Sequence, residues 1–182
     1  TNHRNKLKVQ GSVTYNGIEG DRTDTFFLSK LVSYIDQNDH HIPTLKVRET
    51  LDFAFRCLIG EHHGMESPTF EEFRREIGSK VDNTLDFLGL ENCQDTIVGN
   101  SLMRGVSGGQ KKRVTTGEML IGDFGAIFAD EISTGLDAAT TFDEIKLLQA
   151  ITKIMKLNVV VSLLQPAPEV YNLFDDVLLL DA

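Results

Sequence analysis

The sequence predicts an α/β fold with a mostly parallel sheet core, an inserted helical subdomain and an N-terminal antiparallel β element. Two short apolar runs without alternation, 126–129 and 158–164, are typical of parallel strands covered on both faces. Amphipathic helical patterns alternate with strand-like runs after residue 104, which favours parallel strands joined by helices. Residues 45–103 carry mainly helical periodicity, so we expect a helical subdomain there, between core parts 1–44 and 104–182.

The composition is that of one globular domain. The chain has 182 residues, 41% hydrophobic and 25% charged, enough for a single core. Its net charge of -9 disfavours a nucleic-acid partner. Cys57 and Cys93 lie outside any metal-binding spacing, which suits a reducing compartment. The chain starts with neither a Met nor a signal peptide and has no apolar run near the roughly 20 residues of a membrane helix, so we expect an internal piece of a longer protein.

Two strands are expected in the N-terminal part. Residues 7–16 alternate as a strand does, and Asn16-Gly17 suits a hairpin turn. Residues 29–35 are rich in β-forming side chains and end at Asp36.

Two helices follow in the predicted helical subdomain. Apolar residues recur at helical spacing over 51–58, and again from Phe70 to Leu88, where the pattern stops before Gly89. A capping box at Thr69 marks the start of the second helix, after a loop at 60–68. The four histidines at positions 40, 41, 62 and 63 have no ligand set at metal spacing, so we expect them to be solvated loop residues.

The C-terminal part alternates helices and strands. A helix is expected after Asp137, with one side formed by Phe142, Ile145, Leu148, Ile151 or Thr152, and Met155. The proline-containing segment 165–168 ends the strand at 158–164. A short helix at 170–174 and a buried strand at 177–180 complete the prediction.

Ser107-Gly108-Gly109-Gln110 has the form of a capping box and predicts a helix towards Leu120. A helix start presents unpaired N–H groups and the positive end of a dipole, and glycines allow a phosphate to approach the backbone closely. The basic residues 111–113 lie where the dipole disfavours them, which a helix selected only for stability would avoid. The alternative is an ordinary capped helix with a solvated basic face.

Asp130 and Glu131 follow the apolar run 126–129 directly. Successive strand side chains point to opposite faces, so we expect the two carboxylates to have different roles. One can hold a hydrated Mg²⁺ and the other can orient or deprotonate a water. The alternative is a pair of acids solvated by the loop. The polar turn 133–137 then leads to a helix cap at Asp137.

These segments resemble those of ATP-binding-cassette ATPases. Val-Ser-Gly-Gly-Gln (106–110) is similar to the family's signature, 126–131 to its Walker B strand, and Gly-Leu-Asp (135–137) to its D-loop. The residues at 105–120, 130–137 and 162–169 are similar to those of the first nucleotide-binding domain of pleiotropic-drug-resistance transporters, which belong to the G subfamily.

The resemblance implies a P-loop NTPase-like (RecA-like) core that binds ATP and Mg²⁺. It implies that Asp130 and Gln37 contact the metal, that Glu131 is the base or water-orienting group, and that Gln37 and Gln165 line the γ-phosphate. It further implies that an opposite domain's ATP is contacted by Ser107, Gly108, Gly109, Gln110 and Asp137.

The chain departs from the family pattern in two ways. None of its 15 glycines is followed by Lys, so the sequence contains no Walker A motif, G-x-x-x-x-G-K-S/T. We therefore expect a truncated domain that binds ATP poorly and is inactive by itself. Gln165 stands where most cassette ATPases have a His, and Gln cannot gain a proton near neutral pH. We therefore expect slower turnover here than at a His-bearing half-site.

The expected function is ATP hydrolysis that powers efflux of lipophilic compounds. The expected partners are a second nucleotide-binding domain and the transmembrane domains of the same transporter. The plasma membrane is the expected location, with this domain on the cytosolic side. Two alternatives remain open: a soluble cassette ATPase of translation or DNA maintenance, and a non-hydrolysing regulatory domain. The acidic balance disfavours the first alternative.

Overall fold

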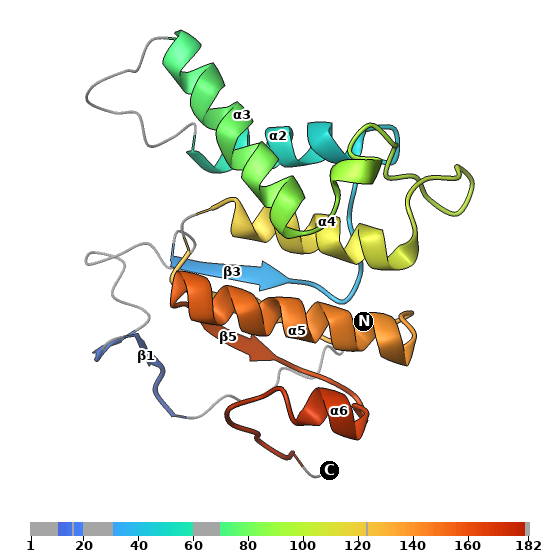
Figure 1. The fold of residues 1–182 in the computed structure, drawn as a ribbon. Coiled ribbons are helices and arrows are strands. Elements are labelled where there is room, and N and C mark those ends of the chain that lie inside the picture. The colour runs from blue at the N-terminus through green and yellow to red at the C-terminus, as the bar shows by residue number, and fades with distance from the viewer. Residues whose placement is uncertain (1–10, 16, 20–30, 60–69, 123, 181–182) are drawn as a thin grey trace, which may run out of the picture.

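The structure is a computed structural model that describes residues 11–15, 17–19, 31–59, 70–122 and 124–180 (Figure 1). Its main sheet has three parallel strands in the order β3 (Val32–Ile35), β4 (Ala126–Ala129) and β5 (Asn158–Val161). A separate antiparallel pair is formed by β1 (Thr14–Tyr15) and β2 (Ile18–Glu19). The predicted fold class is confirmed.

The helices form tiers above and across this sheet. Figure 1 shows α2 (Val47–Ile59) and α3 (Phe70–Phe87) together, with α4 (Gly108–Leu120) between them and β3. Helix α5 (Ala138–Met155) lies across the sheet, and the short α6 (Pro168–Tyr171) packs beside α5. A turn of 3₁₀ helix, η1 (Glu91–Cys93), follows α3. None of the helices in the described ranges is long and apolar enough to cross a membrane.

Two apolar cores meet at α4. One lies among α2, α3 and α4, and the other lies between the sheet, α5 and α6. Val114 and Ile121, which lie outside the predicted subdomain 45–103, belong to the first core. Leu120 packs against both cores, so α4 is fixed to the helical part and to the α/β part at once.

The sheet brings three strand ends to one edge. Ile35, Ala129 and Val161 are register partners at the last positions of β3, β4 and β5. The next residues along the chain are Asp36, Asp130 and Ser162. Because all three strands are parallel, the polar residues that follow them gather at the carboxyl edge.

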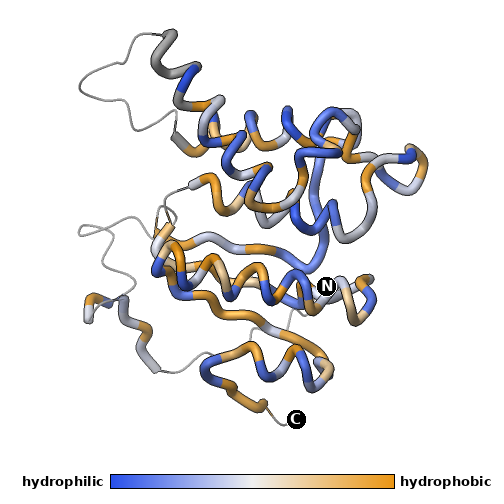
Figure 2. Tube along the Cα trace, in the orientation of Figure 1, coloured by the Kyte–Doolittle hydropathy of each residue, from blue (hydrophilic) through white to orange (hydrophobic). Residues whose placement is uncertain are grey.

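Two strand predictions are wrong in the described part of the chain. The run 158–164 was expected to be covered on both faces, but its strand stops at Val161 and Val160 is 54% exposed. Residues 177–180 form no strand, and Leu178, Leu179 and Leu180 are exposed; Figure 2 shows this apolar stretch near the C-terminus. A strand needs a neighbour for its N–H and C=O groups, and none among the described residues pairs with 177–180.

The remaining elements differ from expectation mainly at their ends. Of the strand expected at 7–16, only Thr14–Tyr15 is a described strand, because 1–10 and 16 lie outside the described residues. The strand expected at 29–35 begins at Val32, with 29 and 30 outside the described residues. The loop 60–68, with its histidines, and Thr69 also lie outside them. The final helix, expected at 170–174, is instead Pro168–Tyr171, since proline is favoured at a first helical position.

Candidate functional site

Asp130 is held by hydrogen bonds from both neighbouring strands. Its Oδ1 accepts from Ser162 Oγ at 2.6 Å, and its Oδ2 accepts from Tyr34 OH at 3.0 Å. The hydrogen bond from Ser162, and then that from Tyr34, keep the pKa of Asp130 below its ordinary value. The carboxylate is therefore charged and oriented, as a metal ligand must be.

Glu131 lies beyond the end of β4, and its carboxylate has a different hydrogen-bond partner from that of Asp130. Strand β4 ends at Ala129, so the alternation expected from the sequence does not reach Glu131. Glu131 has φ 43°, a left-handed conformation that is uncommon for a residue other than glycine. The Glu131 N–H donates to Ser162 Oγ at 2.9 Å, which anchors this turn to the end of β5.

Gln37 meets Glu131 across the carboxyl edge. Gln37 lies two residues beyond β3, and its Nε2 donates to Glu131 Oε2 at 2.7 Å and to Thr134 Oγ1 at 3.3 Å. The sheet therefore brings together three of the predicted site residues, Gln37, Asp130 and Glu131. Gln37 Oε1 and the second Glu131 oxygen are acceptors of the kind that a metal-bound water needs.

Gln165 is not part of this hydrogen-bonded group. It lies four residues beyond β5, is exposed and has φ 47°. Within the described ranges, no side-chain hydrogen bond joins Gln165 to Gln37 or Glu131. Its expected contact with a phosphate stays a prediction.

The start of α4 is capped as the sequence predicted. Ser107 N–H donates to Gln110 Oε1 at 2.9 Å, and Gln110 N–H donates to Ser107 Oγ at 3.2 Å. Ser107 and Gly108 are exposed. The Ser107 hydroxyl accepts in the cap and still has its own hydrogen to donate. The N–H groups of Gly108 and Gly109 face no intrahelical acceptor, as expected for a first turn, so this helix start suits an anion.

The two glycines have different surroundings. A Cβ on Gly108 would meet nothing within 4 Å, whereas a Cβ on Gly109 would lie 2.6 Å from Thr140 Cγ2. Thr140 is in the first turn of α5, whose cap Asp137 accepts from Thr140 N–H at 2.7 Å. That backbone hydrogen bond lowers the pKa of Asp137. A side chain at position 109 would therefore force Thr140 or one of the helices to shift, which cannot be read from the sequence, and the starts of α4 and α5 lie side by side.

The basic run 111–113 is not a solvated face. Lys112 is only 2% exposed and its Nζ lies 2.9 Å from Asp39 Oδ1. Lys111 Nζ donates to the carbonyl of Gly99 at 2.9 Å. Arg113 Nη1 donates to the carbonyl of Leu88 at 3.4 Å. These cations hold neighbouring segments against α4, so the alternative of a solvated basic face is wrong.

The prediction that His41 is solvated is also wrong. Its side chain is 2% exposed, with Nε2 at 3.0 Å from Thr115 Oγ1 and Nδ1 at 3.2 Å from Glu118 Oε2. The adjacent His40 is exposed, as expected. No sequence pattern indicates this difference, because only the packing of α4 against the loop encloses His41.

A buried pair joins α4 to α5. Thr116 Oγ1 donates to Glu144 Oε1 at 2.6 Å, and both residues are buried. Burial raises the pKa of Glu144 above its ordinary value of 4.5, against smaller opposing effects of Thr116, Arg113 and Lys112.

We expect Glu144→Gln to flatten the pH dependence of stability in the full-length protein. A carboxyl whose folded pKa is raised destabilises the fold increasingly as pH rises from 4.5 through the raised value. Glutamine keeps an acceptor for Thr116 and does not titrate. The thermal midpoint of the variant relative to the parent should therefore increase over that range. Glu91→Gln, at an exposed carboxylate, is the control, and a constant offset at all pH values would contradict the expectation.

Sequence reasoning missed five residues that shape this region. They are Tyr34, Asp39, Lys112, Glu144 and Ser162. Only Ser162 had a usable signal, because it lies in the run 158–164 that was predicted as a strand of the same parallel sheet. The others depend on contacts between elements distant in sequence.

The oxygen atoms of the side chains at the carboxyl edge of the sheet suit a magnesium ion whose other ligands are water and phosphate. Carboxylate, amide and hydroxyl oxygens are the ligands Mg²⁺ prefers. In the part of the chain that the structure describes, no group of three or more His, Cys, Asp and Glu residues is placed to hold a metal ion. Such a site would rely on one or two protein carboxylates plus phosphate oxygens, the arrangement usual for nucleotide-bound Mg²⁺.

Comparison with known proteins agrees with this geometry. A family model described as ABC transporter matches residues 3–134. The solved structure of cbiO1 from Clostridium perfringens, part of the ABC transporter complex cbiONQ, superposes with a TM-score of 0.65. That match covers 85% of this chain and 56% of the cbiO1 chain at 23% sequence identity, and supports the fold.

The chain belongs to the ABC transporter family. It is 47% identical over 196 residues to ABC transporter G family member 44 of Oryza sativa subsp. japonica. It is 45% identical over 199 residues to Pleiotropic drug resistance protein 1 of Nicotiana tabacum. These matches cover 96% of this chain, and 13% and 14% of the relatives' lengths. The chain is thus similar to G-family transporters and to a pleiotropic drug resistance protein, and it spans about one eighth of their length.

Proposed function

We propose that this domain binds ATP with Mg²⁺ and hydrolyses it to power efflux of lipophilic compounds by a full-size membrane transporter. The observation that carries the proposal is the meeting of Gln37 and Glu131, at 2.7 Å, beside the oriented carboxylate of Asp130. A charged carboxylate for the metal and a second carboxylate for the water are what phosphoryl transfer to water requires. The relatives' names support the transporter assignment.

Each residue has a distinct part in the proposed reaction. Asp130 and the amide oxygen of Gln37 would hold the metal, which would supply charge neutralisation for the phosphates. Glu131 orients or deprotonates the attacking water, and Gln165 lines the γ-phosphate. Ser107, Gly108, Gly109, Gln110 and Asp137 belong to the surface that meets the ATP of a second nucleotide-binding domain. Both domains would work on the cytosolic side of the membrane, and this segment alone would be inactive.

We expect ATP hydrolysis by the purified full-length protein to require Mg²⁺ through Asp130. Chelation with EDTA should abolish phosphate release, and added Mg²⁺ should restore it. Asp130→Asn should raise the Mg²⁺ concentration for half-maximal turnover about tenfold or more, because a neutral ligand binds the ion more weakly. Because the pKa of Asp130 is lowered, this metal requirement should persist when pH falls from about 7 to about 5.

Asp86→Asn is the matched control, since Asp86 is an exposed carboxylate near the end of α3. An unchanged Mg²⁺ requirement in Asp130→Asn would remove Asp130 from the metal site. A regulatory domain that does not hydrolyse ATP is tested separately by single-turnover measurement. Retention of unhydrolysed ATP by the full-length protein with its other half-site inactivated would favour that function.

A further inference from the structure

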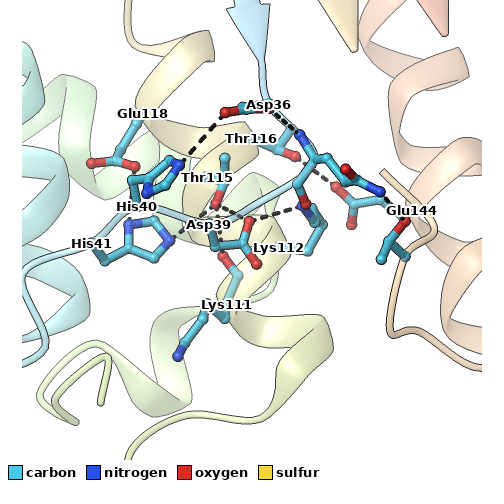
Figure 3. Close-up of polar contacts among 12 residues, drawn as sticks. Asp36, Asp39, His40, His41, Lys111, Lys112, Thr115, Thr116, Glu118 and Glu144 are labelled. Atoms are coloured by element: carbon cyan, nitrogen blue, oxygen red, sulfur yellow. Dashed lines mark hydrogen bonds and ion pairs between the residues drawn. The ribbon is translucent and has the colours of Figure 1, made fainter. Parts of the chain in front are cut away.

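A buried polar cluster joins the loop after β3 to the middle of α4 (Figure 3). We call it the Asp39 cluster, and its members are Asp39, His41, Lys112 and Thr115. Asp39 Oδ1 accepts from Thr115 Oγ1 at 2.7 Å and lies 2.9 Å from Lys112 Nζ. His41 Nε2 lies 3.0 Å from the same Thr115 hydroxyl. Four side chains thus connect two segments that are more than 70 positions apart in sequence.

Lys112 is the enclosed charge of this cluster. Its side chain is 2% exposed and that of Asp39 is 19% exposed, so neither charge is fully solvated. A buried lysine without a partner is strongly destabilising, and a paired one fixes the position of its partner. Lys112 therefore holds the loop at Asp39 against α4 more specifically than apolar packing would.

Lys112 also contacts Gln37, whose side chain belongs to the candidate site. Lys112 Nζ donates to the backbone carbonyl of Gln37 at 3.4 Å, and the Gln37 side chain donates to Glu131 at 2.7 Å. Lys112 thus contacts the backbone of the residue whose side chain meets the proposed water-orienting carboxylate.

Helix α4 connects this contact to the capped turn at Ser107, the other part of the chain that is proposed to meet ATP. Lys112 lies five residues after the cap Ser107, about one and a half helical turns along a continuous helix. An α-helix is stiff over this length. Helix α4 therefore positions both the loop at Gln37 and the turn at Ser107. Helix α4 is fixed to α5 by the packing of Gly109 against Thr140 and by the hydrogen bond from Thr116 to Glu144.

We propose that Lys112 and Asp39 are positioning residues for hydrolysis: their ion pair sets where Gln37 lies relative to Glu131. The inference rests on the proposed function of this site. Neither residue touches ATP in this scheme. Each acts through Gln37, so the effect of removing the ion pair should depend on the Gln37 side chain.

The test is a set of variants in the full-length protein, read by ATP turnover. Lys112→Met keeps the aliphatic stem and removes the charge. We expect kcat to fall roughly 10- to 100-fold with KM for ATP changed by less than about threefold, because misplacement of a group by about 1 Å has effects of this size. In a Gln37→Ala background, Lys112→Met should lower kcat by less than about twofold further. Lys153→Met, at an exposed lysine near the end of α5, is the matched control.

Two results would overturn the inference: no loss of kcat in Lys112→Met, or an equal loss with and without Gln37. Should Lys112→Met fail to fold, Asp39→Asn and Thr115→Val keep the shape of the cluster and carry the same comparison, with an expected loss of about threefold or more. Failure of the proposed function is visible separately, because Glu131→Gln would then leave turnover unchanged. A loss in Glu131→Gln together with none in the cluster variants overturns only the inference.

Discussion

Glu131→Gln is expected to lower ATP turnover of the full-length protein by roughly 10²–10⁴-fold, the usual contribution of a general base. The substitution isolates the chemistry from the fold. Glutamine keeps an oxygen that accepts from Gln37 Nε2, as Glu131 Oε2 does at 2.7 Å. It also has the same side-chain bulk at φ 43°, so the cost of this backbone conformation is unchanged. What is lost is the negative charge that polarises a water.

The measurement is steady-state phosphate release alongside equilibrium binding of labelled ATP. Binding should be retained, since the substitution leaves Asp130 and the start of α4 intact. Glu169→Gln, at an exposed carboxylate of α6, should leave both quantities unchanged. A Glu131→Gln protein that hydrolyses ATP at the parent rate would exclude Glu131 as base or water-orienting residue.

Gly109→Ala should also have a large effect, through packing of α4 against α5. The added Cβ would lie 2.6 Å from Thr140 Cγ2, so α4 and α5 must separate at their starts or Thr140 must leave its rotamer. Overpacking of this kind costs about 1–3 kcal/mol. If this free energy opposes the arrangement of Ser107 and Asp137 that turnover needs, kcat/KM for ATP should fall roughly 5- to 160-fold.

A second substitution tests this explanation directly. Thr140→Ser removes Cγ2 and leaves Cβ and Oγ1, which lie 3.9 and 4.0 Å from the added methyl group, as ordinary contacts. Gly109→Ala with Thr140→Ser should therefore recover most of the thermal midpoint. Gly108→Ala is the matched control for stability, because nothing lies within 4 Å of its Cβ, and a loss of activity there alone would indicate close approach of a ligand. Absence of rescue by Thr140→Ser would refute the packing explanation for Gly109.

Features set by neighbours in sequence could be predicted. The Ser107 cap needs Gln110 three residues later, and the Asp137 cap needs only the N–H of Thr140. The apolar run 126–129 forms β4 within the predicted bounds. Because parallel strands end at one edge, the meeting of Gln37 with Glu131 also followed from the order of the elements.

Features set by contacts between distant segments could not be predicted. Lys111 and Lys112 are adjacent and identical in type, yet Lys112 is enclosed because the loop at Asp39 folds over it. His40 and His41 differ in the same way, since α4 covers only His41. The apolar stretch 177–180 has the composition of a strand but no strand beside it among the described residues.

The sequence by itself thus determined the fold class, the capped helix starts and the acid pair that ends β4, because each depends on short-range hydrogen bonding or on periodicity. The tertiary structure alone decided which charges are buried, why a methyl group at position 109 would meet Thr140 and how Lys112 ties α4 to the loop of Gln37. Those outcomes depend on which surfaces meet, and burial changes the free energy of a charge or a methyl group far more than its neighbours in sequence do.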